Sequence, residues 1–152
     1  MQHVSQPSLP RVFTALALCL AALPAAAQND EAKPAYSDYK GVTVGMTAEA
    51  ARAKLGDPTD KGDTQDFYSV NDKQTVQVYY GPDKKVSAVV VTYLNGGASA
   101  PNPKSIFGSD VEAKPDGSAH RLERYPKAGF WVSYSRTAGD SPLIIITLSK
   151  IQ

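Results

Sequence analysis

The hydrophobic pattern changes its period once near the start of the chain, from helical to extended. Residues 48–55 place Ala51 and Leu55 on one side at helical spacing. Thr47 precedes them as a good N-cap, and Gly56 follows at the position where helices end in left-handed backbone. The pattern therefore predicts a helix of about two to three turns, too short to be stable without tertiary packing.

From residue 67 onward the apolar positions alternate with a period of two, which is typical of strands. In residues 75–80, Gln77 and Tyr79 lie on the face opposite to the valines. Residues 86–94 are apolar on both faces, as in a central strand. Further strands are predicted over residues 67–70, 119–125, 130–136 and 143–149.

The second half of the chain repeats the layout of the first. A single helical turn is predicted at 103–108, and three strands follow it. We therefore predict an α+β fold with two layers, in which short helices cover one face of an antiparallel sheet of about six strands. The α-β-β-β layout is doubled, with pseudo-repeats at about 41–95 and 101–152 of a single domain, residues 41–152.

The start of the chain resembles a secretory signal peptide. Arg11 precedes an apolar run at 12–23, Pro24 breaks the run, and three small residues follow. We expect residues 1–27 to be removed by cleavage between Ala27 and Gln28, giving a periplasmic or secreted protein. The run is too short for a membrane span of roughly 18 or more residues.

Two further features of the first forty residues follow from this prediction. Lipidation of Cys19 would need a small residue before it, but Leu18 stands there, so no stable membrane anchor is expected after cleavage. Residues 28–40 are polar and contain no hydrophobic periodicity, which predicts a flexible tail. Tyr36 and Tyr39 are expected to dock the end of this tail onto the domain.

Charge and composition exclude several classes of function. The chain has 16 Lys and Arg against 15 Asp and Glu, so it lacks the basic character of a nucleic-acid-binding protein. His120 is the one histidine left after cleavage, and zinc needs three or four His or Cys ligands. Asp116 and Ser118 stand near His120, but both belong to a Pro-Asp-Gly-Ser turn. The sequence thus predicts neither an enzyme nor a cofactor.

Two other polar motifs bear on catalysis and on metal binding. Ser37 and Lys40 match the spacing Ser-x-x-Lys of penicillin-binding enzymes, but they lie in the tail and the companion motifs are missing. Four aspartates recur at every third residue and could supply oxygen ligands to calcium. Their spacing differs from that of an EF-hand loop, so we interpret them as a solvated loop. These aspartates are Asp57, Asp60, Asp63 and Asp66.

The outward face of the sheet is the candidate binding surface. If the strand valines face the helices, the aromatic and polar residues that alternate with them face outward. In the strand at 119–125, Arg121 and Tyr125 join this outward face if Leu122 points inward. Tyr, Trp and Arg are the residue types enriched in binding hot spots. In the alternative, loops or the second helix cover this face and Trp131 belongs to the core. The predicted partner-binding residues are Gln77, Tyr79, Arg121, Tyr125, Trp131 and Ser133.

One register is left open by the sequence. A shift of one residue in the strand at 86–94 decides whether Thr92 or Tyr93 joins Tyr79 on the outward face.

The first half resembles a known family. Gly-Met-Thr at 45–47, the short helix, Leu-Gly-Asp-Pro at 55–58 and the strands at 76–80 and 86–91 look like the BamE-like small outer-membrane assembly lipoproteins. The same fold group includes β-lactamase-inhibitor-protein-like domains, which are tandem repeats. The match covers about 41–94, and the second half matches by layout only. The assembly lipoproteins carry a lipidated cysteine, which this chain lacks.

The resemblance implies an envelope module without enzymatic activity that binds another protein through its exposed sheet face. We therefore predict an exported module that binds an envelope or secreted protein. The alternative is a periplasmic carrier that holds a small molecule or a lipid between the sheet and the helices.

Overall fold

The computed structural model describes residues 34–152, so the expected signal peptide and the cleavage site at Ala27 and Gln28 lie outside the described residues. The elements in chain order are α1 (Ala48–Leu55), β1 (Asp60–Lys61), β2 (Gln65–Asn71), β3 (Gln74–Tyr80), β4 (Val86–Tyr93), α2 (Pro103–Phe107), β5 (Ala119–Tyr125), the 3-10 turn η1 (Pro126–Ala128), β6 (Phe130–Arg136) and β7 (Ile144–Lys150). Among these elements no helix is long and apolar enough to span a membrane.

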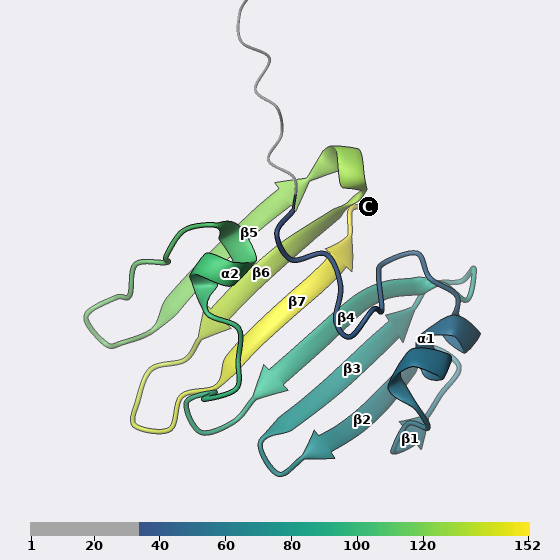
Figure 1. Cartoon of the computed structure of the whole chain (residues 1–152), viewed down its shortest axis with the longest axis horizontal. Helices are drawn as coiled ribbons and strands as arrows, with labels where there is room; N and C mark the ends of the chain where they lie inside the picture. The colour runs from purple at the N-terminus through teal and green to yellow at the C-terminus, as the bar shows by residue number, and fades with distance from the viewer. Residues whose placement is uncertain (1–33) are drawn as a thin grey trace, which may run out of the picture.

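All strands form one antiparallel sheet of seven strands, in the order β1-β2-β3-β4-β7-β6-β5 (Figure 1). The strands β2 to β4 form one meander and β5 to β7 form another. The two meanders meet where β4 pairs with β7. The predicted α+β fold, with its doubled α-β-β-β layout, is thereby confirmed. The seventh strand is β1, whose two residues are too short for an alternating pattern to show.

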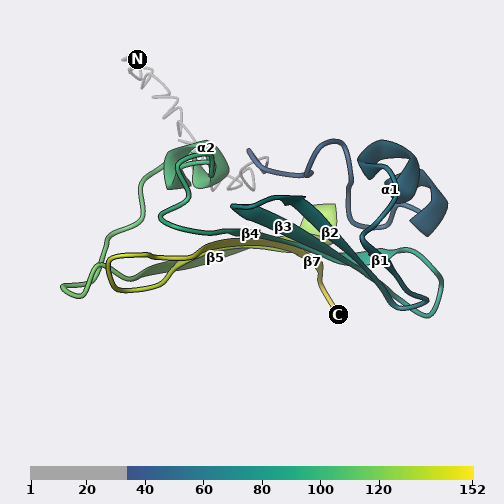
Figure 2. The same ribbon diagram turned by 90° about the horizontal axis from the view of Figure 1, so that it is seen from below.

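The two helices lie on the same side of the sheet, and residues 34–47 cross between them (Figures 1 and 2). This side of the sheet forms the core, since its strand positions are almost all buried. Val42 and Ile106 are fully buried against it from the covering layer. Tyr39 is buried as well, and its hydroxyl accepts a hydrogen bond of 2.9 Å from Gln74 Nε2. The end of the expected tail therefore packs on the domain.

Helix α1 has the bounds that its capping residues predict. Thr47 Oγ1 accepts a hydrogen bond from Ala50 N at 3.3 Å, and Gly56 follows the helix with φ of 85°. The buried residues of the helix are two alanines, so its apolar contact with the sheet is small. Burial of about 25 cal/mol per Å² of apolar surface cannot anchor such a helix strongly. A polar contact fixes it instead.

This contact is the buried network of Arg52, Asp66 and Tyr80. Asp66 on β2 has no exposed surface, and its Oδ2 lies 2.7 Å from Arg52 Nε and 2.6 Å from the Tyr80 hydroxyl. Its Oδ1 accepts hydrogen bonds from Arg52 Nη2 at 3.0 Å and from Gly62 N at 3.2 Å. The expectation of a solvated loop was therefore wrong for Asp66, because this residue already belongs to β2 and shares its inward face with Tyr68.

The network also sets the protonation of its members. Burial alone would raise the pKa of Asp66, but hydrogen bonds from Arg52 and Tyr80 outweigh it and hold that pKa below its usual value. Burial and the hydrogen bond to Asp66 raise the pKa of Tyr80. The carboxylate is thus charged, and the phenol neutral, over the ordinary range of pH.

Candidate functional site

The candidate site is the face of the sheet turned away from α1 and α2, which we call the open face. Figure 2 shows both helices and residues 34–47 on the opposite side. The strand pairings place three residues each of β3, β4, β7 and β6 on the open face, and none of the twelve is charged. They are Thr75, Gln77, Tyr79, Ala88, Val90, Thr92, Ile145, Thr147, Ser149, Trp131, Ser133 and Ser135.

The solvent-facing positions of a strand ordinarily include charged residues. The twelve positions of the open face include none, which distinguishes this face from an ordinary solvent-exposed sheet surface. The cores of protein interfaces are depleted in charge and enriched in aromatic residues. The four central strands of the open face show both properties, because Tyr79 and Trp131 project from it. Each of these two aromatic side chains is partly exposed.

Four of the six predicted partner-binding residues lie on this face. Gln77 and Tyr79 come from β3, and the Tyr79 hydroxyl donates a 3.1 Å hydrogen bond to Gln77 Oε1. Trp131 and Ser133 come from β6, and Ser133 is 8% exposed. Trp131 pairs across the strands with Ser149, a small residue.

The register that the sequence left open is settled by the pairing of β3 with β4. Thr75 lies opposite Thr92 and Gln77 opposite Val90, so Thr92 shares the open face with Tyr79. Tyr93 faces the core and is 4% exposed.

The expected placement of Arg121 and Tyr125 was wrong. Both residues lie on the helix side of β5, where Arg121 pairs with Tyr134 and Tyr125 with Phe130 of the core face. The guanidinium of Arg121 stacks 4.8 Å from the ring centre of Phe107 in α2. Leu122 points to the open face instead and is 45% exposed.

The reason is that β5 is an edge strand, where the helix layer consists of one five-residue helix. Polar side chains hold that helix. Arg121 forms an ion pair with Glu123 and donates a 2.7 Å hydrogen bond to Ser109 Oγ. The Tyr125 hydroxyl donates a 2.7 Å hydrogen bond to Glu123 Oε2. Burial, followed by this bond, raises the pKa of Tyr125 to about 12.

Charge appears on the open face only toward its two lateral edges. Arg124 of β5 pairs with Trp131 and is exposed at one edge. Asp60 of β1 pairs with Phe67 and is exposed at the other edge. Phe67 and Leu122 are thus open-face residues that the sequence reasoning missed. Phe67 pairs with Gln77, so it could have been assigned to this face from the predicted face of Gln77 and the turn at 71–73 that sets the register between the two strands.

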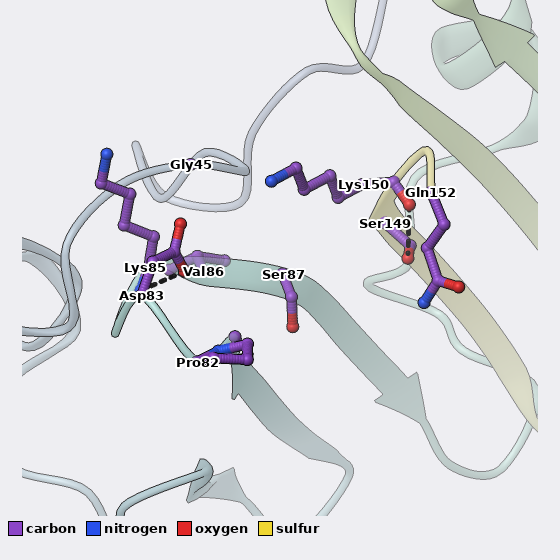
Figure 3. Close-up of a pocket in the computed structure, with 10 residues that line it drawn as sticks. Gly45, Pro82, Asp83, Lys85, Val86, Ser87, Ser149, Lys150 and Gln152 are labelled. Carbon is purple, nitrogen blue, oxygen red and sulfur yellow. Dashed lines mark hydrogen bonds between the residues drawn. The ribbon is translucent and has the colours of Figure 1, made fainter.

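A hollow of about 610 Å³ opens at the end of the sheet, between the start of β4 and the end of β7 (Figure 3). Val86, Ser87, Ser149 and Lys150 line it, and Lys85 stands at its rim. Next to it, the pairing between β3 and β4 shifts by one residue around Ser87. The carrier hypothesis expects a cavity between sheet and helices, whereas this hollow lies at the sheet end.

No metal-binding group of three or more His, Cys, Asp or Glu side chains occurs within 34–152. The carboxylate of Asp66 is occupied by Arg52 and Tyr80, so it is not available to a cation.

Comparison with known proteins gives a fold likeness alone. No family model matches the chain, and no curated protein matches it. One solved structure resembles it, that of a DUF4309 family protein (YjgB) from Bacillus subtilis, with 15% identity and a TM-score of 0.48. The likeness covers 74% of this chain and 84% of that protein.

Proposed function

We propose that this chain is an exported, non-enzymatic protein-binding module of the cell envelope, and that it binds a protein partner through the open face. The observation that carries the proposal is the uncharged surface of β3, β4, β7 and β6, from which Tyr79 and Trp131 project. A partner that covers this surface removes its apolar area from water. Such burial stabilises a complex by about 25 cal/mol per Å² of apolar area.

Two features support a protein as the partner. The face is broad and follows the whole sheet, which suits a flat partner better than a small ligand, whose sites are concave. Hydroxyl and amide groups alternate with the apolar ones, as at Thr92, Thr147 and Gln77, and they can form the hydrogen bonds that a protein interface needs at about one per 100–200 Å².

The location rests on the sequence. Residues 1–27 have the order of charge, apolar run and small residues that a secretory signal needs. The resemblance of residues 41–94 to the BamE-like lipoproteins agrees with an envelope role. An exported chain without an anchor would meet its partner in the periplasm or outside the cell.

A photo-crosslinking residue at Trp131 tests the proposal in the cell envelope. We expect one dominant protein to be captured, and the same probe at Asp63, in an exposed loop away from the face, to capture nothing specific. Replacing both Tyr79 and Trp131 by alanine should abolish binding to that protein while the fold, measured by circular dichroism, is kept. Capture that is equal at Trp131 and Asp63 would contradict the proposal.

A carrier of small molecules is the second candidate; its site would be the hollow of about 610 Å³ at the end of the sheet, in place of the expected cavity between the sheet and the helices. This volume falls within the range of about 300–1,000 Å³ for ligand sites. Native mass spectrometry of the protein released from the envelope would show a bound small molecule. A Ser87→Trp variant, which fills the hollow, should lose that ligand.

A further inference from the structure

The strand β5 forms one lateral edge of the sheet, and no strand lies beyond it (Figure 1). The opposite edge is formed by β1, which has two residues, whereas β5 has seven. Edge strands carry backbone N–H and C=O groups without a partner, and folded proteins usually shorten, cover or bend such strands. A long edge such as β5 can pair with another strand.

The hydrogen bonds at the two ends of β6 show which backbone groups of β5 face this edge. Gly129 O accepts a hydrogen bond of 2.9 Å from Ile151 N, and Thr137 N donates one of 3.0 Å to Leu143 O. Odd-numbered residues of β6 therefore turn their backbone groups to β7 and even-numbered ones to β5, because this direction alternates along a strand. The even-numbered residues of β6 pair with odd-numbered residues of β5. The backbone groups left to face the open edge are those of His120, Leu122 and Arg124.

Within residues 34–152 these three residues make no backbone hydrogen bond to a loop. We propose that the edge of β5 pairs with the same edge of a second copy, antiparallel and centred on Leu122. The two sheets of seven strands then form one continuous sheet. Its two-fold axis is perpendicular to the sheet, so the helices of both copies lie on one side and both open faces on the other. The contact uses a different surface from the open face and does not depend on the proposed function.

The backbone restricts the register of this pairing. In an antiparallel pair, a residue whose backbone groups face the neighbouring strand lies opposite another such residue. Leu122 can therefore lie opposite His120, Leu122 or Arg124 of the second copy. In all three registers the odd-numbered residues of the two strands also lie opposite one another, on the helix side of the joined sheet.

The charges select one of the three registers. With Leu122 opposite its own copy, Arg121 lies opposite Glu123 of the second copy, and Glu123 opposite Arg121. With Leu122 opposite His120, Arg121 would lie opposite Arg121. With Leu122 opposite Arg124, Glu123 would lie opposite Glu123. Opposite charges directly across two strands stabilise their pairing, and like charges destabilise it.

The side chains in the selected register are available to a second copy. Arg121 and Glu123 are 30% and 28% exposed and already form an ion pair within one chain. In the joined sheet each carboxylate lies between two guanidinium groups, and each guanidinium between two carboxylates. Leu122, which is 45% exposed, meets its own copy on the other side of the sheet and is removed from water. The remaining cross-strand pairs are Ala119 with Tyr125 and His120 with Arg124.

Amide hydrogen exchange of the exported, processed protein tests the pairing at the backbone. We expect a weak dimer with a dissociation constant of about 100 µM, because one strand edge buries less than the roughly 1,200 Å² of a stable interface. The N–H groups of His120, Leu122 and Arg124 should then exchange about fourfold more slowly at about 1 mM than at about 10 µM protein. The N–H groups of Arg121 and Glu123, which face β6, are the internal control and should exchange slowly at both concentrations.

A disulfide tests the position of the axis. Leu122→Cys places two thiols at the axis, where Cα atoms about 5.5 Å apart suit a disulfide. Cys19, the one cysteine of the chain, lies in the expected signal peptide, so the processed protein has no other thiol. Under mild oxidation Leu122→Cys should form linked dimers much faster than Val70→Cys. Val70 is a matched control, since it is 38% exposed and belongs to β2, near the opposite edge.

A charge exchange tests the register. Glu123→Arg places arginines opposite one another at two contacts and should weaken the dimer about tenfold or more. Adding Arg121→Glu to this variant restores opposite charges at both contacts and should return the affinity to that of the natural protein. Sedimentation equilibrium measures all three proteins.

Three results would each overturn the proposal. They are a monomer at about 1 mM, equal disulfide formation in Leu122→Cys and Val70→Cys, and a charge-exchanged variant as weak as Glu123→Arg. The Trp131 probe reports on the open face alone. A monomeric protein whose probe still captures an envelope protein would therefore reject the dimer and leave the proposed function standing.

Discussion

The two halves of the molecule join their helices to the shared sheet with the same three kinds of side chain, but they place them differently. In each half an arginine, a carboxylate and a tyrosine form one hydrogen-bonded set. In the first half these residues come from three elements, α1, β2 and β3. In the second half all three come from β5. The two sets are Arg52, Asp66 and Tyr80, and Arg121, Glu123 and Tyr125.

The difference in burial decides what each set contributes. The side chain of Asp66 is fully buried, whereas that of Glu123 is 28% exposed. Removing one partner of a buried pair leaves a charge without compensation, whereas water replaces a partner at the surface. The first set therefore fixes the packing of α1, and the second mainly positions the short helix α2 through Phe107.

The largest expected effect distinguishes the two arginines. Arg52→Ala should lower the free energy of unfolding by about 3–5 kcal/mol, because Asp66 stays buried without its cation. Arg121→Ala, the matched variant in the other half, should lower it by less than about 1 kcal/mol. Urea unfolding of both variants measures the contrast, and equal losses would show that the two sets are equivalent.

The acid limb of stability tests the buried carboxylate next. The pKa of Asp66 is lowered in the folded protein, so its stabilising contribution is present above the unfolded value of about 3.9. It is lost as the pH falls from there through the folded pKa. Urea unfolding between about pH 7 and pH 2 should therefore show a steeper loss for the natural protein than for Asp66→Asn. Identical slopes would contradict this role.

The tyrosines give a smaller contrast. Tyr80→Phe removes a hydrogen bond to a buried carboxylate and should cost about 1.5–3 kcal/mol, whereas Tyr125→Phe should cost about 1 kcal/mol. Both pKa values are raised, so the contribution of each phenol is present below the unfolded pKa of about 10 and is lost at higher pH. For Tyr125 the loss falls between about 10 and 12. Tyrosinate absorbance measures the titration of the two phenols, and unfolding in alkali measures the stability that each contributes. Equal losses in Tyr80→Phe and Tyr125→Phe would contradict the expected difference.

The helix caps should give the smallest difference. Asn102 caps α2 with a 2.8 Å hydrogen bond from Ser105 N, and Thr47 caps α1 with a longer one of 3.3 Å. Replacing either by alanine should cost about 1 kcal/mol. Asn102→Ala should cost more, because five residues form little helix without their cap. Thermal unfolding of the two variants gives the order, and a greater loss for Thr47→Ala would reverse it.

Local signals made much of this fold predictable. Thr47 and Gly56 gave the bounds of α1, and the alternation in residues 75–80 gave the face of Gln77 and Tyr79 correctly. The strands of the second half were found at their observed places, within a residue at β7. In these elements a single local pattern determines the bounds of the element or the face to which its side chains point.

The errors fall where a distant partner decides. Leu122 seemed to belong in the core because it is apolar, but Arg121 takes the inward phase of β5 and stacks on Phe107 of α2, which lies well before it in the chain. Asp66 seemed solvated because it ends a run of aspartates, but Arg52 lies fourteen positions earlier in the chain and neutralises it. No local pattern records either contact.

The pairing of β4 with β7 affects how the chain folds while it is being synthesised. The strand β4 carries no charge on either face, and its partner is separated from it by residues 94–143. Until the last strand of the chain has been made, one edge of β4 stays without its native neighbour, and an unpaired apolar edge invites other chains. Shortening the chain from its end should therefore yield insoluble protein rather than a smaller folded one, and the final strand serves as the protection of the first half against aggregation.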